Sequence, residues 1–165
     1  MSEIADLFHQ LTFGVYVVGV ADGERRDAFT AAWLTQTSFE PLLLVVSVNP
    51  QNASHPILRS GRSFTVNVLR QGQVELARRF GTRSGRDEDK LAGVRWHAGR
   101  GGAPILDDAL AYFECELRET LPAGDHELVL GKVIDGRILA PGAGPMTYAE
   151  TGELDGSRAL YPHRF

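Results

Sequence analysis

Residues able to bind a cofactor are concentrated between positions 27 and 55 of the chain. The segment Phe29-Thr30-Ala31-Ala32-Trp33 has the alternation of a strand, but alanines and hydroxyls stand where bulky side chains are usual. A flat ligand could lie against such a strand and be hydrogen-bonded by its peptide groups. The later segment Asn49 to Pro56 offers N–H donors, a hydroxyl and side-chain amides, which suit a phosphate monoester. A ring and a phosphate together predict a flavin mononucleotide (FMN) site.

Two strands and a helix entrance must position these groups. Thr12 to Val20 is rich in β-branched and aromatic residues, and the turn dipeptide Asp22-Gly23 predicts a hairpin into the strand that begins near Ala28. Leu42 to Val48 is apolar on both faces, which predicts a central strand. Ser54-His55-Pro56 is typical of a helix start with a polar cap, and we expect this short helix to end before Gly61.

The second half of the chain keeps mainly to strands. Ser63 to Leu69 is a further short strand, and Gln73 to Phe80 is a surface helix with one apolar stripe. Ala109 to Leu117 alternates with period two, and Glu127 to Ile134 is a long strand in which Gly131 predicts a bulge or a barrel bend. The glycines and prolines of residues 141–145 break the chain before a polar tail that we expect to reach a partner subunit. Together these elements predict one mainly β domain over residues 1–165, an antiparallel barrel of about six strands with short peripheral helices.

Composition excludes several function classes. The formal net charge of −4 and pI near 5.7 provide no field for nucleic acid or acidic membranes. Cys115 is the single cysteine, so neither a disulfide within the chain nor a cysteine-cluster zinc site is expected. His9, His97 and His163 are isolated, and we expect surface residues rather than metal ligands. No basic leader or membrane-length apolar run is present, which predicts a soluble cytoplasmic protein.

An ordered set of sequence blocks resembles the flavin reductase-like family, the FMN-binding split β-barrel proteins of Greek-key type, and especially its flavoredoxin-like branch. The blocks cover roughly residues 8–152, and their order is more specific than any one of them. They are Phe29-Thr30-Ala31-Ala32-Trp33, Ser38-Phe39-Glu40-Pro41, Ser60-Gly61, Phe64-Thr65-Val66-Asn67-Val68-Leu69, Leu76-Ala77-Arg78-Arg79-Phe80-Gly81, residues 84–93, Gly102-Ala103-Pro104-Ile105-Leu106 and Gly124-Asp125-His126.

The resemblance implies a role for each part of the site. The strand would face the isoalloxazine ring, the next strand end would border the ribityl chain, the helix entrance would hold the phosphate, and a lid would close over the flavin. The implied ring residues are Phe29, Thr30, Ala31, Ala32, Trp33 and Thr35; the ribityl residues are Ser47, Val48 and Asn49; the phosphate residues are Asn52, Ser54 and His55; the lid residues are Phe80 and Lys90.

Two of these assignments have simpler alternatives. The strand from Phe29 to Ser38 is also consistent with an edge strand whose hydroxyls face water. The loop from Gly81 to Gly93 is also consistent with a solvated excursion. The resemblance favours a lid that often crosses a dimer interface, with Lys90 and Arg86 offering cations to the phosphates of a nicotinamide cofactor.

The tripeptide Gly124-Asp125-His126 carries the catalytic hypothesis. Proteins similar to this one that oxidise reduced nicotinamides have this tripeptide. His126 would lie over the ring face where the nicotinamide stacks, and would hydrogen-bond the carboxamide or the developing flavin anion; Asp125 would orient it. The alternative is a turn followed by an exposed imidazole.

The expected activity is that of an NAD(P)H-dependent flavin (FMN) oxidoreductase, with NADH or NADPH as the donor. Hydride would pass to N5 of FMN, and electrons would then pass to free flavin, oxygen or a partner protein such as a monooxygenase. The alternatives are a flavoredoxin-like FMN electron carrier and a non-catalytic flavin-binding module. No Rossmann, Walker, nucleophile-elbow or zinc-peptidase motif is present. A flavin on an outer strand beside Trp33 would leave apolar surface open, which predicts a homodimer.

Overall fold

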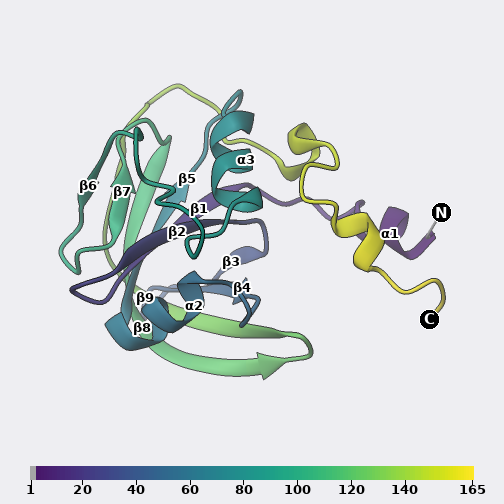
Figure 1. Cartoon of the computed structure of the whole chain (residues 1–165), viewed down its shortest axis with the longest axis horizontal. Coiled ribbons are helices and arrows are strands. Elements are labelled where there is room, and N and C mark those ends of the chain that lie inside the picture. The colour runs from purple at the N-terminus through teal and green to yellow at the C-terminus, as the bar shows by residue number, and fades with distance from the viewer. Residues whose placement is uncertain (1–2) are drawn as a thin grey trace.

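The strand β1 (Tyr16–Ala21) turns back on β2 (Arg26–Ala31) at the predicted hairpin. Gly23 of the turn has a φ of +94°, a conformation that favours glycine. The computed structural model describes residues 3–165, and Figure 1 shows this hairpin against the rest of the chain. The hairpin predicted from the turn dipeptide Asp22-Gly23 is therefore present in the structure.

The main sheet has seven strands, one more than the predicted number of about six. The further strands are β3 (Leu34–Ser38), β4 (Leu43–Val48), β5 (Ser63–Val68), β8 (Ala111–Ala123) and β9 (His126–Ile138). The order is β2-β1-β5-β8-β9-β4-β3, and every neighbouring pair is antiparallel. The prediction of a mainly β, antiparallel fold with short helices is confirmed. The sheet does not close into a full barrel, because no ladder joins β2 to β3.

The predicted single strand from Phe29 to Ser38 is two strands at opposite edges of the sheet. Ala31 is the last residue of β2 to pair with β1, and Leu34 is the first residue of β3 to pair with β4. Between them, Ala32 and Trp33 belong to neither ladder. We call these two residues the crossover. The single-strand prediction was wrong because the chain changes partner there, which residue types alone do not reveal.

The strand β4 has a partner on both sides, as the prediction of a central strand requires. It lies one place from the sheet edge, between β9 and β3. Leu44, Val46 and Val48 are buried, whereas Leu43 and Val45 are half-buried on the other face. The continuous apolar run therefore did not mean full burial on both faces.

Short helices cover the core. The helix α2 (Ser54–Gly61) places Ile57 and Leu58 among the buried side chains of the strands. The helix α3 (Val74–Thr82) packs Ala77 and Phe80 in a second buried cluster that also includes Ala28 of β2. A separate hairpin pairs β6 (Trp96–Ala98) with β7 (Pro104–Leu106).

The strands β8 and β9 form a hairpin with thirteen residues in each strand. The strand β8 begins two residues later than predicted and ends later, at Ala123, whereas β9 extends beyond the prediction at both ends. Gly131 of β9 lies over the ring of Phe64, which a Cβ would approach to 2.5 Å. The bulge lies opposite Gly131, in β8 between Leu117 and Glu119. The predicted bulge therefore belongs to the partner strand, and the glycine is needed for close packing.

The two ends of the chain pack together beside the sheet (Figure 1). The helix α1 (Glu3–Phe8) meets the C-terminal 3-10 turns η1 (Tyr148–Thr151) and η2 (Ser157–Leu160). The rings of Phe8 and Tyr161 lie 5.5 Å apart, and Arg158 makes an ion pair with Asp6 at 2.5 Å. We call residues 3–13 and 147–161 the terminal segments. Contact of the tail with a partner subunit stays a prediction. Within residues 3–165, no helix is long and apolar enough to span a membrane.

Candidate functional site

A pocket of about 270 Å³ opens where the crossover, the end of β4 and the terminal segments meet. We call it the ring pocket. Its lining residues from the sheet side are Phe29, Thr30, Ala31, Ala32, Trp33, Ser47, Val48, Asn49, Asn52 and His126. All ten were predicted site residues, drawn from three separate segments of the sequence. The structure therefore brings the expected ring, ribityl and catalytic residues to one place.

The crossover supplies unpaired peptide groups to this pocket. The carbonyl of Ala32 accepts from the N–H of Leu34 at 3.1 Å, and the carbonyl of Trp33 accepts from the N–H of Ser47 at 2.9 Å. Within the described part of the chain, the N–H groups of Ala32 and Trp33 have no hydrogen-bond partner. A backbone N–H group that a ligand shields from water needs a hydrogen-bond acceptor. The carbonyl oxygens of a flat heteroaromatic ring can provide one.

His126 is fixed at the pocket edge by two neighbours. Its Nδ1 lies 2.7 Å from Oδ1 of Asp125, and its ring centroid lies 5.0 Å from that of Trp33. This hydrogen bond lowers the pKa of the Asp125 carboxyl below its ordinary value. With Nδ1 bonded to the carboxylate, Nε2 is the nitrogen left for a ligand. Asp125 lies outside the pocket and is exposed, so its bond to His126 is what connects it to the pocket.

A second pocket, of about 330 Å³, continues from the first. The two share Phe29, Thr30, Asn49 and Asn52. Its other lining residues are Gln51, Ala53, Phe80, Gly81, Arg83, Ser84, Arg86 and Lys90. We call it the phosphate pocket. The predicted lid residues Phe80 and Lys90 are in its wall, and residues 81–90 of the predicted lid approach the site of their own chain.

The phosphate pocket carries free hydrogen-bond donors. Oδ1 of Asn52 accepts from the N–H of Ser54 at 3.0 Å, which leaves the Nδ2 donors of Asn52 without a partner in the described structure. The guanidinium of Arg86 donates to the carbonyl of Gln51 at 3.1 Å, and its other guanidinium N–H groups have no partner among the described residues. Arg83 makes one exposed ion pair with Glu88, at 3.4 Å. Two guanidinium groups beside an amide fit a phosphate.

Beneath this pocket, Asp27 binds both Lys90 and Ser54. Nζ of Lys90 lies 3.4 Å from Oδ1 of Asp27, and the Ser54 hydroxyl donates to Oδ2 at 2.7 Å. All three side chains are buried. Burial lowers the pKa of Lys90, and the carboxylate of Asp27 opposes that shift.

Four of the predicted site residues line neither pocket. The hydroxyl and N–H of Ser54 are both bonded within the protein, and Nε2 of His55 lies 3.0 Å from Glu127. Thr35 is exposed on β3, and Asp125 lies behind His126. Their sequence positions are near the site, but their side chains are directed to other partners.

Sequence reasoning missed the wall formed by the terminal segments. These lining residues are Phe8, His9, Phe13, Tyr148, Asp155, Ser157, Leu160 and Tyr161. The available signal was the presence of aromatic residues in otherwise polar ends of the chain. Arg83 and Ser84 of the phosphate pocket were also missed, although they stand beside the predicted Arg86.

Comparison with known proteins shows the family of the chain. Residues 8–155 match the model of the flavin reductase like domain, and the chain belongs to that family. It is 38% identical over 143 residues to the high molecular weight rubredoxin of Moorella thermoacetica, which covers 86% of the chain. The match spans only 62% of that relative, so the whole activity of the relative does not transfer.

Solved structures share the fold. The NADH:FAD oxidoreductase SgcE6 of Streptomyces globisporus superposes with a TM-score of 0.83 at 31% identity, over 90% of this chain and 88% of that one. An FMN-binding protein of Thermus thermophilus, solved with bound 1-cyclohex-2-enone, gives 0.76 at 34% identity, over 81% and 75% of the two chains. The family prediction is confirmed, whereas the flavoredoxin-like branch stays a prediction.

Proposed function

We propose that this protein is an NAD(P)H-dependent oxidoreductase that binds FMN. The observation that carries the proposal is that the two pockets adjoin and share four lining residues, one walled by unpaired peptide donors and the other by two arginines and side-chain amides. A flavin with a terminal phosphate has these two chemical parts, joined by a chain of hydroxyl groups. Membership of the flavin reductase-like family supports the same conclusion.

In this proposal the crossover binds the flavin ring through its backbone. The N–H groups of Ala32 and Trp33 donate to ring acceptors, and Ser47 and Asn49 border the ribityl hydroxyls. Peptide donors held by two separate strands are already oriented before binding, which lowers the entropy lost when the ligand binds.

The phosphate is held by Asn52, Arg83, Ser84 and Arg86. Charge-assisted hydrogen bonds to a phosphate are about twice as strong as neutral ones. Ser54 supports them from below through Asp27, and does not itself contact the ligand. The site favours FMN over riboflavin, because riboflavin has no phosphate to accept hydrogen bonds from Arg83 and Arg86.

His126 acts on the electron donor. A bound flavin accepts hydride at N5 and supplies the redox chemistry. The chain holds the nicotinamide in place, because Nε2 of His126 can hydrogen-bond its carboxamide while Asp125 fixes the imidazole. Correct alignment of two stacked rings is a large part of the rate of such a transfer. The electrons then pass to free flavin, oxygen or a partner such as a monooxygenase.

A homodimer completes this proposal. Trp33 is 45% exposed beside the ring pocket, and Phe8 and Leu160 are exposed on the terminal segments near it. A contiguous apolar surface of this kind commonly marks an association site. A two-fold partner placed there would cover the open side of each flavin site.

The decisive experiment is anaerobic mixing of the FMN-loaded protein with NADH or NADPH while the flavin absorption band is followed. Bleaching at a rate that rises with nicotinamide concentration is the expected result. An FMN complex that neither nicotinamide reduces, but that a reduced electron-transfer protein does reduce, would instead favour the electron carrier. Failure to bind FMN at all would contradict both functions.

A further inference from the structure

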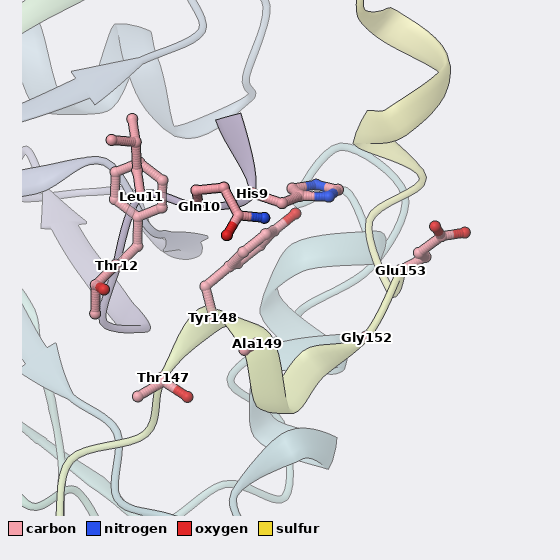
Figure 2. A pocket seen from close by; sticks show the side chains of 10 residues that line it. His9, Gln10, Leu11, Thr12, Thr147, Tyr148, Ala149, Gly152 and Glu153 are labelled. Atoms are coloured by element: carbon pink, nitrogen blue, oxygen red, sulfur yellow. The ribbon is translucent and has the colours of Figure 1, made fainter. Parts of the chain in front are cut away.

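A third cavity, of about 460 Å³, lies between the two terminal segments (Figure 2). We call it the terminal groove. Its lining residues are His9, Gln10, Leu11, Thr12, Phe13, Thr147, Tyr148, Ala149, Gly152 and Glu153. None belongs to the cofactor site that the sequence predicted. The volume is within the range of small-molecule sites, roughly 300–1,000 Å³.

The terminal groove adjoins the ring pocket. His9, Phe13 and Tyr148 line both cavities. At its opposite end the ring pocket runs into the phosphate pocket, which the FMN phosphate fills in the proposed function. A dinucleotide whose nicotinamide stacks near His126 therefore has the terminal groove as its open exit.

The groove has the surfaces that an adenosine needs. Figure 2 shows the ring of Tyr148 lying across the groove, with the side chains of Gln10 and His9 beside it. The Tyr148 hydroxyl donates to Asp155 at 2.8 Å and lies 3.0 Å from Ser157, so the ring is held in one orientation. Partial burial also raises the pKa of Tyr148 to about 12, so it stays neutral. An aromatic face suits a purine, and amide and hydroxyl groups suit ribose.

The charge of the groove argues against an extra phosphate. Among the described lining residues none is Lys or Arg, and Glu153 places a carboxylate on the rim. The nearby Arg158 is already paired with Asp6 at 2.5 Å and with Glu153 at 3.7 Å. A site for a 2′-phosphate normally supplies a free arginine, whereas a carboxylate accepts from ribose hydroxyls.

From these observations we propose that the terminal groove binds the adenosine half of the reduced dinucleotide and that Glu153 makes the protein select NADH over NADPH. The proposal rests on the proposed function, since it assumes a nicotinamide donor at the ring pocket. Repulsion between Glu153 and a 2′-phosphate at the rim is expected to give a preference of roughly tenfold.

The test measures binding without hydride transfer. ADP-ribose and its 2′-phosphorylated form are titrated calorimetrically into the FMN-loaded protein, because they contain the adenosine half but no nicotinamide. We expect ADP-ribose to bind roughly tenfold more tightly. Glu153→Arg should bring the two affinities together or reverse them. Glu24→Arg, a matched charge change at the exposed β1–β2 turn, should leave the ratio unchanged.

A kinetic comparison completes the test. Reduced nicotinamide mononucleotide, which lacks adenosine, should show a higher KM than NADH with the same flavin product. Three results would overturn the inference. They are equal KM values for NADH and the mononucleotide, equal affinities for ADP-ribose and its 2′-phosphorylated form, and a groove closed to both compounds by a second copy of the chain. If ADP-ribose binds with the expected preference but no nicotinamide reduces the flavin, the proposed function fails, and the two failures are thereby distinguished.

Discussion

Lys90 and Asp27 form a buried ion pair, with Nζ and Oδ1 3.4 Å apart, although 63 positions separate them in the sequence (90 − 27). The pair joins the loop after α3 to the strand β2, and Ser54 adds the start of α2. Gly85 of the same loop lies so close that a Cβ would approach Asp27 to 2.4 Å. One carboxylate thus fixes three elements around the phosphate pocket.

Removal of Asp27 should strongly destabilise the fold. Asp27→Ala leaves the charge of Lys90 buried without its partner, and such changes cost about 3–5 kcal/mol. The measurement is the free energy of unfolding in urea. Glu75→Gln, which breaks the exposed pair with Arg78, is the control and should change it by less than about 1 kcal/mol.

The double variant Asp27→Ala/Lys90→Met provides the internal check. It removes both buried charges, so it should recover much of the loss. A double variant no more stable than Asp27→Ala would show that the buried charge is not the cause.

Cys115 should be unreactive in the native protein and should report on alkaline unfolding. Burial raises its pKa from 9.0 to about 12. Because the folded pKa is the higher one, this stabilising contribution is complete below about pH 9 and is lost as pH rises toward 12, at up to about 1.4 kcal/mol per pH unit.

The measurement is the free energy of unfolding against pH for the wild type and Cys115→Ala. The wild type should show a steeper alkaline decline, and a thiol reagent should label Cys115 only after denaturation. Parallel pH curves for the two proteins, or rapid native labelling, would contradict the assignment.

Arg86 should discriminate FMN from riboflavin. Arg86→Ala removes a charge-assisted bond to the phosphate and should weaken FMN binding by about 1–3 kcal/mol, with riboflavin unaffected. Flavin fluorescence titration gives both affinities. Arg118→Ala, an exposed change on β8, is the control. Equal losses for both flavins would remove Arg86 from the phosphate site.

His126→Ala should slow flavin reduction by NADH by roughly 10- to 100-fold through lost alignment of the donor. FMN affinity should change little, because the imidazole contacts the donor side. Stopped-flow reduction under anaerobic conditions measures the rate. Asp125→Asn keeps the imidazole but weakens its orientation, and an intermediate rate is expected. An unaltered reduction rate in His126→Ala would show that this histidine does not align the electron donor.

Binding of FMN should stabilise a homodimer, because a ligand covered by both chains raises the free energy of separating them. Sedimentation of the apo and FMN-loaded protein over a dilution series measures this. Leu160→Ser, on the exposed tail, should weaken the dimer, whereas Ile138→Ser, at the opposite end of β9 from His126, should not. A monomer with stoichiometric FMN would show that each chain forms a complete site.

Local sequence signals predicted the fold where neighbouring residues decide the structure. The Asp22-Gly23 turn and the α3 stripe depend on contacts close in sequence or on a single period. The alternation predicted in β8 holds only from Cys115 to Arg118: Phe113 is exposed and Glu114 is buried, because the register shifts between Glu114 and Cys115. The crossover was missed because Ala32 and Trp33 resemble strand residues, and only the choice of partner strand shows that they leave the ladder.

The site was predicted in a similarly uneven way. Backbone recognition near Ala31 followed from residue size, and His126 from a short motif. The commitment of Ser54 and Lys90 to Asp27 depends on contacts between distant segments, which no local pattern encodes. The wall formed by Tyr148 likewise requires both ends of the chain to meet.

The crossover has a consequence for how the specificity of this fold can change. Main-chain groups are the same whichever amino acid carries them, so substitutions at Ala32 or Trp33 can alter the fit of a ring without removing the donors that bind it. Discrimination among planar ligands must then come from the two ends of the cavity, where Arg86 and Glu153 carry opposite charges. Ligand specificity in such a protein can therefore change by substitution of side chains at the two ends of the cavity, without any change in the strands.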